Sequence, residues 1–203
     1  MEILDPGVVE ARTNMTPDEA VRHLMEGNER FASDTMTHLG QSLNILRQRT
    51  VEKQEPFASV LSCADSRVPV ELVFDQTIGG LFVARVAGNF VTPEILGSLE
   101  YGVVVLGTKV ILVLGHSSCG AVTATMLGND VPGQISSLFS HIQPAVDRAG
   151  GNLEKAVKEN AILQADRLTE SSQVLAELVK DGKLKIVAGY YDLATGRVSL
   201  LES

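Results

Sequence analysis

The sequence predicts an α/β protein built on a mainly parallel β-sheet of four to five strands flanked by helices. Short apolar runs typical of buried strands alternate with longer segments of helical periodicity, which is the pattern of strand–helix–strand units. The most apolar run, 109–114, lacks polar alternation and therefore favours a central parallel strand covered on both faces. At 203 residues the chain is long enough for a sizeable core, and we expect an N-terminal arm over 1–15 and a single α/β domain over 16–203.

Each expected element follows from a local signal. The first helix begins at Thr16, which can cap it, with Pro17 at the first helical position. Strands are expected where apolar residues run between turn signals, at 57–62, 81–86, 109–114, 185–191 and 198–201. Further helices are expected at 42–54, 69–74, 92–106, 120–127, 134–149 with an interruption at Pro144, and 153–179.

Composition limits the partners. The formal net charge is −8 and the isoelectric point is near 5.0, without a basic stripe, which argues against nucleic acid and anionic membrane surfaces as partners. Residues 1–11 lack the pattern of a secretory signal, and the apolar runs are too short to span a bilayer. We therefore expect a cytoplasmic protein.

Polar residues follow two of the expected strands. Cys63, Asp65 and Arg67 occupy alternate positions after the strand at 57–62, so an extended backbone would direct them to one side. His116 and Cys119 follow the strand at 109–114. In parallel sheets, sites form beyond the carboxyl ends of the strands, and both segments lie there.

The two cysteines allow three interpretations. Each alone could be a buried small hydrophobe, or the pair could form a disulfide. Their polar positions at strand ends, beside His116, Asp65 and Arg67, favour metal ligation.

Two thiolates and one imidazole leave one position open on a tetrahedral Zn²⁺, which is typical of catalytic rather than structural sites. The open position can hold a water that becomes hydroxide and attacks an electrophilic carbon, or Asp65 can fill it in a closed, inactive state. Because two thiolates neutralise the formal charge of the metal, we expect a bound-water pKa above about 7, with activity rising into the alkaline range. Asp65 would orient the nucleophile while Arg67 keeps the carboxylate ionised, although an ordinary surface ion pair is the alternative for these two residues.

The segments 63–69 and 116–120 closely resemble the two signature motifs of β-class carbonic anhydrases. The resemblance extends through 82–89, 97–101 and 189–196, and covers nearly the whole chain from Thr16. It implies zinc, reversible hydration of CO₂ to bicarbonate, and a homodimer or a larger assembly of dimers.

The resemblance also assigns residues. Cys63, His116 and Cys119 match the zinc ligands, and Asp65 with Arg67 matches the catalytic dyad. The remaining matches are substrate-binding positions, some completed by the partner subunit: Gln54, Phe82, Ala87 and Tyr101.

Two positions depart from the family pattern. Some members have a regulatory bicarbonate site that uses a tryptophan where this chain has Val60, so we expect no such site and a zinc open to water. Gly80 replaces the usual acidic residue of a turn, which bears on loop geometry and removes no catalytic group.

Three other functions remain open at this stage. The same fold and ligands serve CS₂ or COS hydrolysis in some relatives. A catalytically silent bicarbonate-binding or assembly protein is the second. The third is an enzyme with a nucleophilic cysteine and His116 as its base, whose activity would survive chelation.

Overall fold

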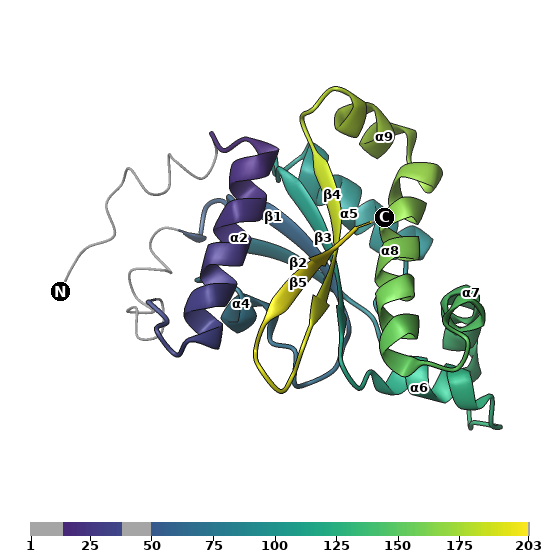
Figure 1. Cartoon of the computed structure of the whole chain (residues 1–203). Helices are drawn as coiled ribbons and strands as arrows, with labels where there is room; N and C mark the ends of the chain where they lie inside the picture. The colour runs from purple at the N-terminus through teal and green to yellow at the C-terminus, as the bar shows by residue number, and fades with distance from the viewer. Residues whose placement is uncertain (1–13, 38–49, 203) are drawn as a thin grey trace.

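A five-stranded sheet forms the centre of the computed structural model, which describes residues 14–37 and 50–202 (Figure 1). The strand order is β2-β1-β3-β4-β5; the first four strands run parallel, and β5 pairs antiparallel with β4. The strands are β1 Ala58–Ser62, β2 Leu81–Arg85, β3 Val110–His116, β4 Lys185–Tyr191 and β5 Val198–Leu201. The predicted mainly parallel α/β fold is confirmed, and each predicted strand lies within two residues of its observed bounds.

Helices cover both faces of the sheet. They are α2 Pro17–Ala32, α4 Val70–Val73, α5 Pro93–Val104, α6 Gly120–Leu127, α7 Phe139–Ala149, α8 Leu153–Ser171 and α9 Gln173–Lys180, with a 3₁₀ turn, η1, at Ile135–Leu138. Figure 1 shows α2 on one side of the sheet and α8 on the other. No helix in these described parts of the chain is long and apolar enough to cross a membrane.

The central strands supply both halves of the core. Every residue of β1 and β3 is buried, as expected for parallel strands covered on two faces. Side chains alternate between the faces, so Val60 and Leu112 pack with α2 and α4, whereas Leu61 and Ile111 pack with α5, α8 and α9. This packing fixes the register of β1 and β3, at whose carboxyl ends Cys63 and His116 lie.

The predicted start of the first helix is confirmed. Thr16 accepts a hydrogen bond from the Glu19 N–H, and the Glu19 carboxylate in turn accepts one from the Thr16 N–H, which is a complete capping box with Pro17 at the first helical position.

Two helix predictions were wrong. The expected interruption at Pro144 is absent, because α7 continues through Pro144 with that residue facing solvent while Ile142 and Ala145 pack inside. The single helix expected over 153–179 is instead two helices that meet at Ser172. The Ser172 side chain accepts a hydrogen bond from Leu175 N–H and so caps α9.

Most of the helix predicted over 42–54 lies outside the described residues. Within its described end, Thr50 is helical and Gln54 lies in an exposed segment that leads to β1.

Candidate metal centre

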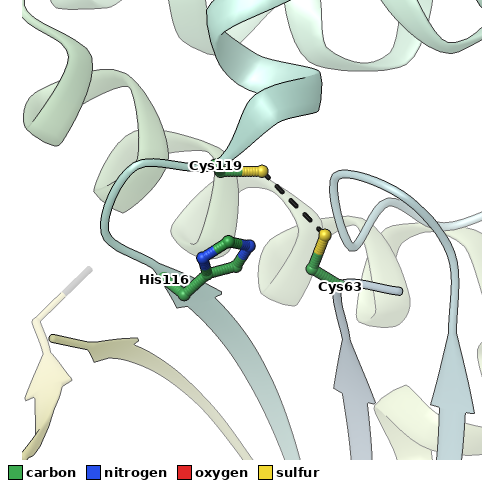
Figure 2. A group of neighbouring side chains, drawn as sticks. All are labelled: Cys63, His116 and Cys119. Atoms are coloured by element: carbon green, nitrogen blue, oxygen red, sulfur yellow. Dashed lines mark hydrogen bonds between the residues drawn. The ribbon is translucent and has the colours of Figure 1, made fainter. Parts of the chain in front are cut away.

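Two strand ends and one helix start bring Cys63, His116 and Cys119 together. Cys63 directly follows β1, His116 is the last residue of β3, and Cys119 is the N-cap of α6. Because β1 and β3 are adjacent parallel strands, their carboxyl ends lie at the same edge of the sheet. All three side chains are buried, their ligand atoms lie within 4.8 Å of one another, and they face a common centre (Figure 2).

The distance between the two sulfurs fits a metal rather than a disulfide. The Sγ atoms of Cys63 and Cys119 lie 4.0 Å apart, and both cysteines are free thiols. A disulfide would require about 2.05 Å. Zinc–sulfur bonds of about 2.3 Å at tetrahedral angles would place two sulfurs roughly 3.8 Å apart, close to the observed separation.

The hydrogen bonding of His116 leaves one nitrogen for a metal. Its Nδ1 lies 2.9 Å from the carbonyl oxygen of Ser117, and since a carbonyl only accepts, Nδ1 carries the proton. Nε2 therefore has a free lone pair. This atom is buried and has no hydrogen-bond partner among the residues that the structure describes. A buried imidazole nitrogen oriented in this way fits metal ligation.

The two thiols cannot easily both ionise without a cation. A hydrogen bond from the Cys119 thiol lowers the pKa of Cys63, with smaller contributions from His116 and from the Gly88 N–H, which lies 3.3 Å from Cys63 Sγ. The same contact with Cys63, together with burial, raises the pKa of Cys119. A dication between the sulfurs would stabilise both thiolates, so the donor set fits Zn²⁺.

Asp65 and Arg67 form a bidentate pair beside this centre. Arg67 Nε donates to Asp65 Oδ1 at 3.0 Å, and Nη2 donates to Oδ2 at 2.7 Å. The side-chain hydrogen bonds from Arg67 hold the pKa of Asp65 well below its usual range. Asp65 Oδ2 also lies 3.8 Å from His116 Nε2, so the carboxylate is next to the candidate metal position.

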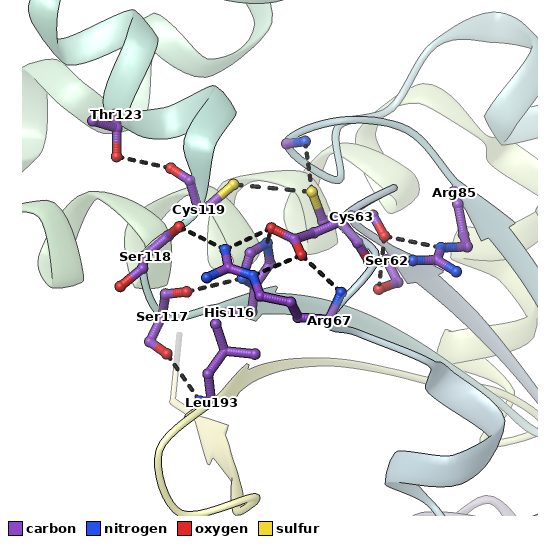
Figure 3. Close-up of polar contacts among 12 residues, drawn as sticks. Ser62, Cys63, Arg67, Arg85, His116, Ser117, Ser118, Cys119, Thr123 and Leu193 are labelled. Atoms are coloured by element: carbon purple, nitrogen blue, oxygen red, sulfur yellow. Dashed lines mark hydrogen bonds and ion pairs between the residues drawn. The ribbon is translucent and has the colours of Figure 1, made fainter.

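Arg67 also joins the two segments. Its Nη2 donates to the carbonyl oxygen of Ser118 at 3.2 Å, in the loop between His116 and Cys119 (Figure 3). The Arg67 side chain thus connects the segment after β1 to the segment after β3, and this connection restrains where the Asp65 carboxylate lies relative to the thiols.

Arg85, the last residue of β2, holds the backbone of the segment that carries Cys63 and Asp65. No role was assigned to it from the sequence. Its Nε donates to the carbonyl of Cys63 at 2.9 Å, and its Nη2 donates to the carbonyl of Asp65 at 2.7 Å (Figure 3). The guanidinium therefore fixes the backbone on both sides of Ala64. The signal that could have indicated this role is a charged residue at the end of an apolar strand, at the same edge of the sheet as Cys63 and His116.

The predicted substrate-binding residues separate into two groups. Ala87 adjoins Gly88, whose N–H contacts Cys63 Sγ, so it lies near the centre. Phe82 pairs with Ser59 in the sheet, four residues before Cys63, which is roughly 13 Å along the strand. Tyr101, on α5, lies 6.2 Å from Phe82 between ring centroids and is 47% exposed. Within one chain, Phe82 is therefore not brought to the thiols, and Tyr101 lies with Phe82 at the β2 edge of the sheet.

Val60 and Gly80 occupy ordinary structural positions. Val60 is fully buried in the core beneath α2, and the Gly80 N–H closes a turn by donating to the carbonyl of Thr77 at 3.1 Å.

The fold and this centre define an α/β protein with a buried group of two thiols and one imidazole that could hold a metal. The family model of carbonic anhydrases matches residues 58–198. The chain is 38% identical over 200 residues to Carbonic anhydrase 2 of Mycobacterium tuberculosis, with 92% of this chain and 94% of that protein covered. It is 30% identical over 223 residues to Beta carbonic anhydrase 6, mitochondrial, of Arabidopsis thaliana, with 90% and 74% covered.

Solved structures show the same similarity. The Coccomyxa beta-carbonic anhydrase, in complex with acetazolamide, matches with a TM-score of 0.70 and 25% sequence identity, covering 99% of this chain and 87% of that one. The chain therefore belongs to the carbonic anhydrase family, and to its β class.

Proposed function

We propose that this protein catalyses the reversible hydration of CO₂ to bicarbonate with zinc held by Cys63, His116 and Cys119. The observation that carries the proposal is the buried Nε2 of His116, which faces two thiols 4.0 Å apart and lies beside an arginine-bound carboxylate. Membership of the carbonic anhydrase family supports the reaction.

Cys63, His116 and Cys119 would hold the zinc, which would supply a water with a pKa low enough for it to act as the nucleophile on CO₂. Asp65, whose Oδ2 lies 3.8 Å from His116 Nε2, would accept a hydrogen bond from such a water and so direct a lone pair toward the substrate. Arg67 keeps the Asp65 carboxylate ionised and engages both of its oxygens, Oδ1 through Nε and Oδ2 through Nη2. We therefore favour the open site over one that Asp65 closes. Because two thiolates offset the charge of the metal, the rate should rise into the alkaline range.

For the substrate we propose a pocket that includes Ala87 and the amide of Gln54, completed by Phe82 and Tyr101 of a second copy of the chain. Within one chain, Phe82 lies roughly 13 Å along the sheet from Cys63. The surface near Tyr101 supports a homodimer, because Val104 at the end of the same helix and Val105 just after it are 58% and 61% exposed, and β2 is an edge strand.

The dimer can be tested with Tyr101→Asp. A carboxylate on this apolar surface should shift the protein from dimer or larger assembly toward monomer and strongly reduce CO₂ hydration, while zinc content stays unchanged. Analytical ultracentrifugation and zinc analysis measure these effects. The matched control is Val174→Asp on α9, because Val174 is also 47% exposed. A wild type that is monomeric and fully active would contradict the shared pocket.

The proposed reaction is tested by stopped-flow CO₂ hydration on protein of known zinc content, with COS and CS₂ hydrolysis assayed in parallel. We expect CO₂ hydration to be the dominant activity. Hydrolysis of the sulfur compounds without CO₂ hydration would reassign the substrate. Loss of all three activities in zinc-loaded protein would point to a silent bicarbonate-binding or assembly role, and activity that survives chelation would point to a cysteine nucleophile.

We also propose a cytoplasmic location. The low cysteine content supports it, because two cysteines in 203 residues do not make the disulfide framework typical of secreted proteins.

A further inference from the structure

Helix α8 buries two side-chain amides that the metal centre does not contact. Asn160 and Gln164 are 1% and 2% exposed and lie one turn apart on the same face of the helix. The other buried residues of α8 are all apolar: Ala156, Val157, Ala161, Ala165 and Leu168. A buried amide is costly unless its hydrogen bonds are made, so the partners of these two side chains indicate what they do.

Both amides bind the loop between β2 and α5. The Nδ2 of Asn160 donates to the carbonyl of Gly88 at 2.9 Å. The Oε1 of Gln164 accepts from the N–H of Val91 at 2.8 Å, and its Nε2 donates to the carbonyl of His141 at 3.2 Å. Helix α8 thus holds the loop over 86–91 at two points three residues apart.

The same loop contacts a candidate metal ligand. The Gly88 N–H donates to Cys63 Sγ at 3.3 Å, while the Gly88 carbonyl accepts from Asn160. Gly88 therefore links Asn160 to the thiol. Gly88 has φ of +88°, and a Cβ there would lie 2.5 Å from Cδ1 of Ile142. Only glycine fits this backbone, and with its carbonyl held by Asn160 the direction of its N–H is restrained.

We propose that Asn160 is a positioning residue for Cys63: by holding the Gly88 carbonyl, it sets the N–H···S hydrogen bond to the metal-binding thiolate, and Gln164 supports the same loop. Such a bond orients the sulfur and withdraws charge from it, which tunes the strength of its bond to the metal. The inference rests on the proposed metal site but not on the reaction that the site performs.

The test is Asn160→Leu, which has a similar volume but no donor for the Gly88 carbonyl. We expect zinc affinity, measured by competition with a chelator, to fall about tenfold, the lower end for partners of metal ligands, because the lost orientation of the sulfur outweighs its greater electron density. In cobalt-substituted protein, we expect the sulfur-to-metal charge-transfer band to move to lower energy, because the sulfur becomes more electron-rich.

The matched control is Leu168→Ala, a buried apolar position on the same helix. This change should lower thermal stability and leave both zinc affinity and the charge-transfer band unmoved. If Asn160→Leu lowers stability in the same way and also leaves both readouts unmoved, Asn160 only supports the fold and the proposal is overturned.

Two measurements keep the proposal testable if Asn160→Leu does not fold. Gln164→Met releases the Val91 N–H and should move both readouts in the same direction by a smaller amount. In cadmium-113-substituted wild type, the Gly88 amide proton should show scalar coupling to the metal through the sulfur. Absence of this coupling would overturn the proposal.

The wild type separates this inference from the proposed function. A wild type that binds no zinc would overturn both. A wild type that binds zinc, with Asn160→Leu equal to it in affinity and spectrum, would overturn this inference alone.

Discussion

Replacing Asp65 with asparagine is expected to slow CO₂ hydration by at least about a hundredfold at unchanged zinc content, within the usual range for a group that handles a proton. Asparagine keeps the shape of the side chain but loses the charge that Arg67 holds through two hydrogen bonds. Its amide can also present a donor instead of an acceptor to the attacking water. Stopped-flow hydration assays with zinc quantified in each sample measure the effect.

The matched control is Asp166→Asn, the same chemical change at an exposed position of α8. It should leave the rate within twofold of wild type. An Asp65→Asn protein that retains the rate of this control would contradict the proposed role of the Asp65–Arg67 pair.

The pH dependence of the difference between wild type and Asp65→Asn follows from the lowered pKa of Asp65 in the wild type. The chief cause of this lowered pKa is the side-chain hydrogen bonding from Arg67. A carboxyl with a lowered pKa in the folded state contributes stability above its unfolded pKa of about 3.9, and this contribution is lost as pH falls through the folded value. Because its pKa is lowered, Asp65 is ionised throughout neutral and alkaline pH. The ratio of wild-type to variant rates should stay constant across that range, and a ratio that falls toward neutral pH would mean that Asp65 titrates there.

The second large effect is expected for Cys119→Ser. A serine hydroxyl is similar in size but remains protonated, and metal ligands must be deprotonated, so zinc affinity should fall by more than about a hundredfold and hydration should be lost. Chelator competition and metal analysis measure the affinity. Ser66→Ala, at an exposed position between Asp65 and Arg67, is the control that should keep both zinc and most activity.

A Cys119→Ser protein that binds zinc as the wild type does would show that Cys119 is not a ligand. A variant that loses zinc but keeps activity would instead favour a cysteine nucleophile at Cys63.

The centre was largely predictable because it depends on local geometry at strand ends. Alternation after β1 placed Cys63 and Asp65 on one side, and the adjacency of parallel strands brought His116 beside them. What the pattern could not reveal was the direction of each polar group. The sequence shows Asn160 and Gln164 only as polar residues of an amphipathic helix, and nothing local indicates that both are buried against a loop more than 70 residues away.

The helix errors have a similar cause. Pro144 and Ser172 carry opposite local signals: a proline tends to break a helix, and a serine can continue one or cap the next. Packing of Ile142 and Ala145 overrides the first signal, and a capping bond with Leu175 decides the second. The separation of Phe82 from the thiols was likewise invisible without the sheet register.

The measurement that most directly tests the account is CO₂ hydration followed while zinc is titrated back into metal-stripped protein. The account predicts negligible activity in the stripped protein, a linear rise with added zinc, and saturation at one zinc per chain held by Cys63, His116 and Cys119. Full activity before zinc is added, or no hydration at any pH with one zinc bound per chain, would contradict it.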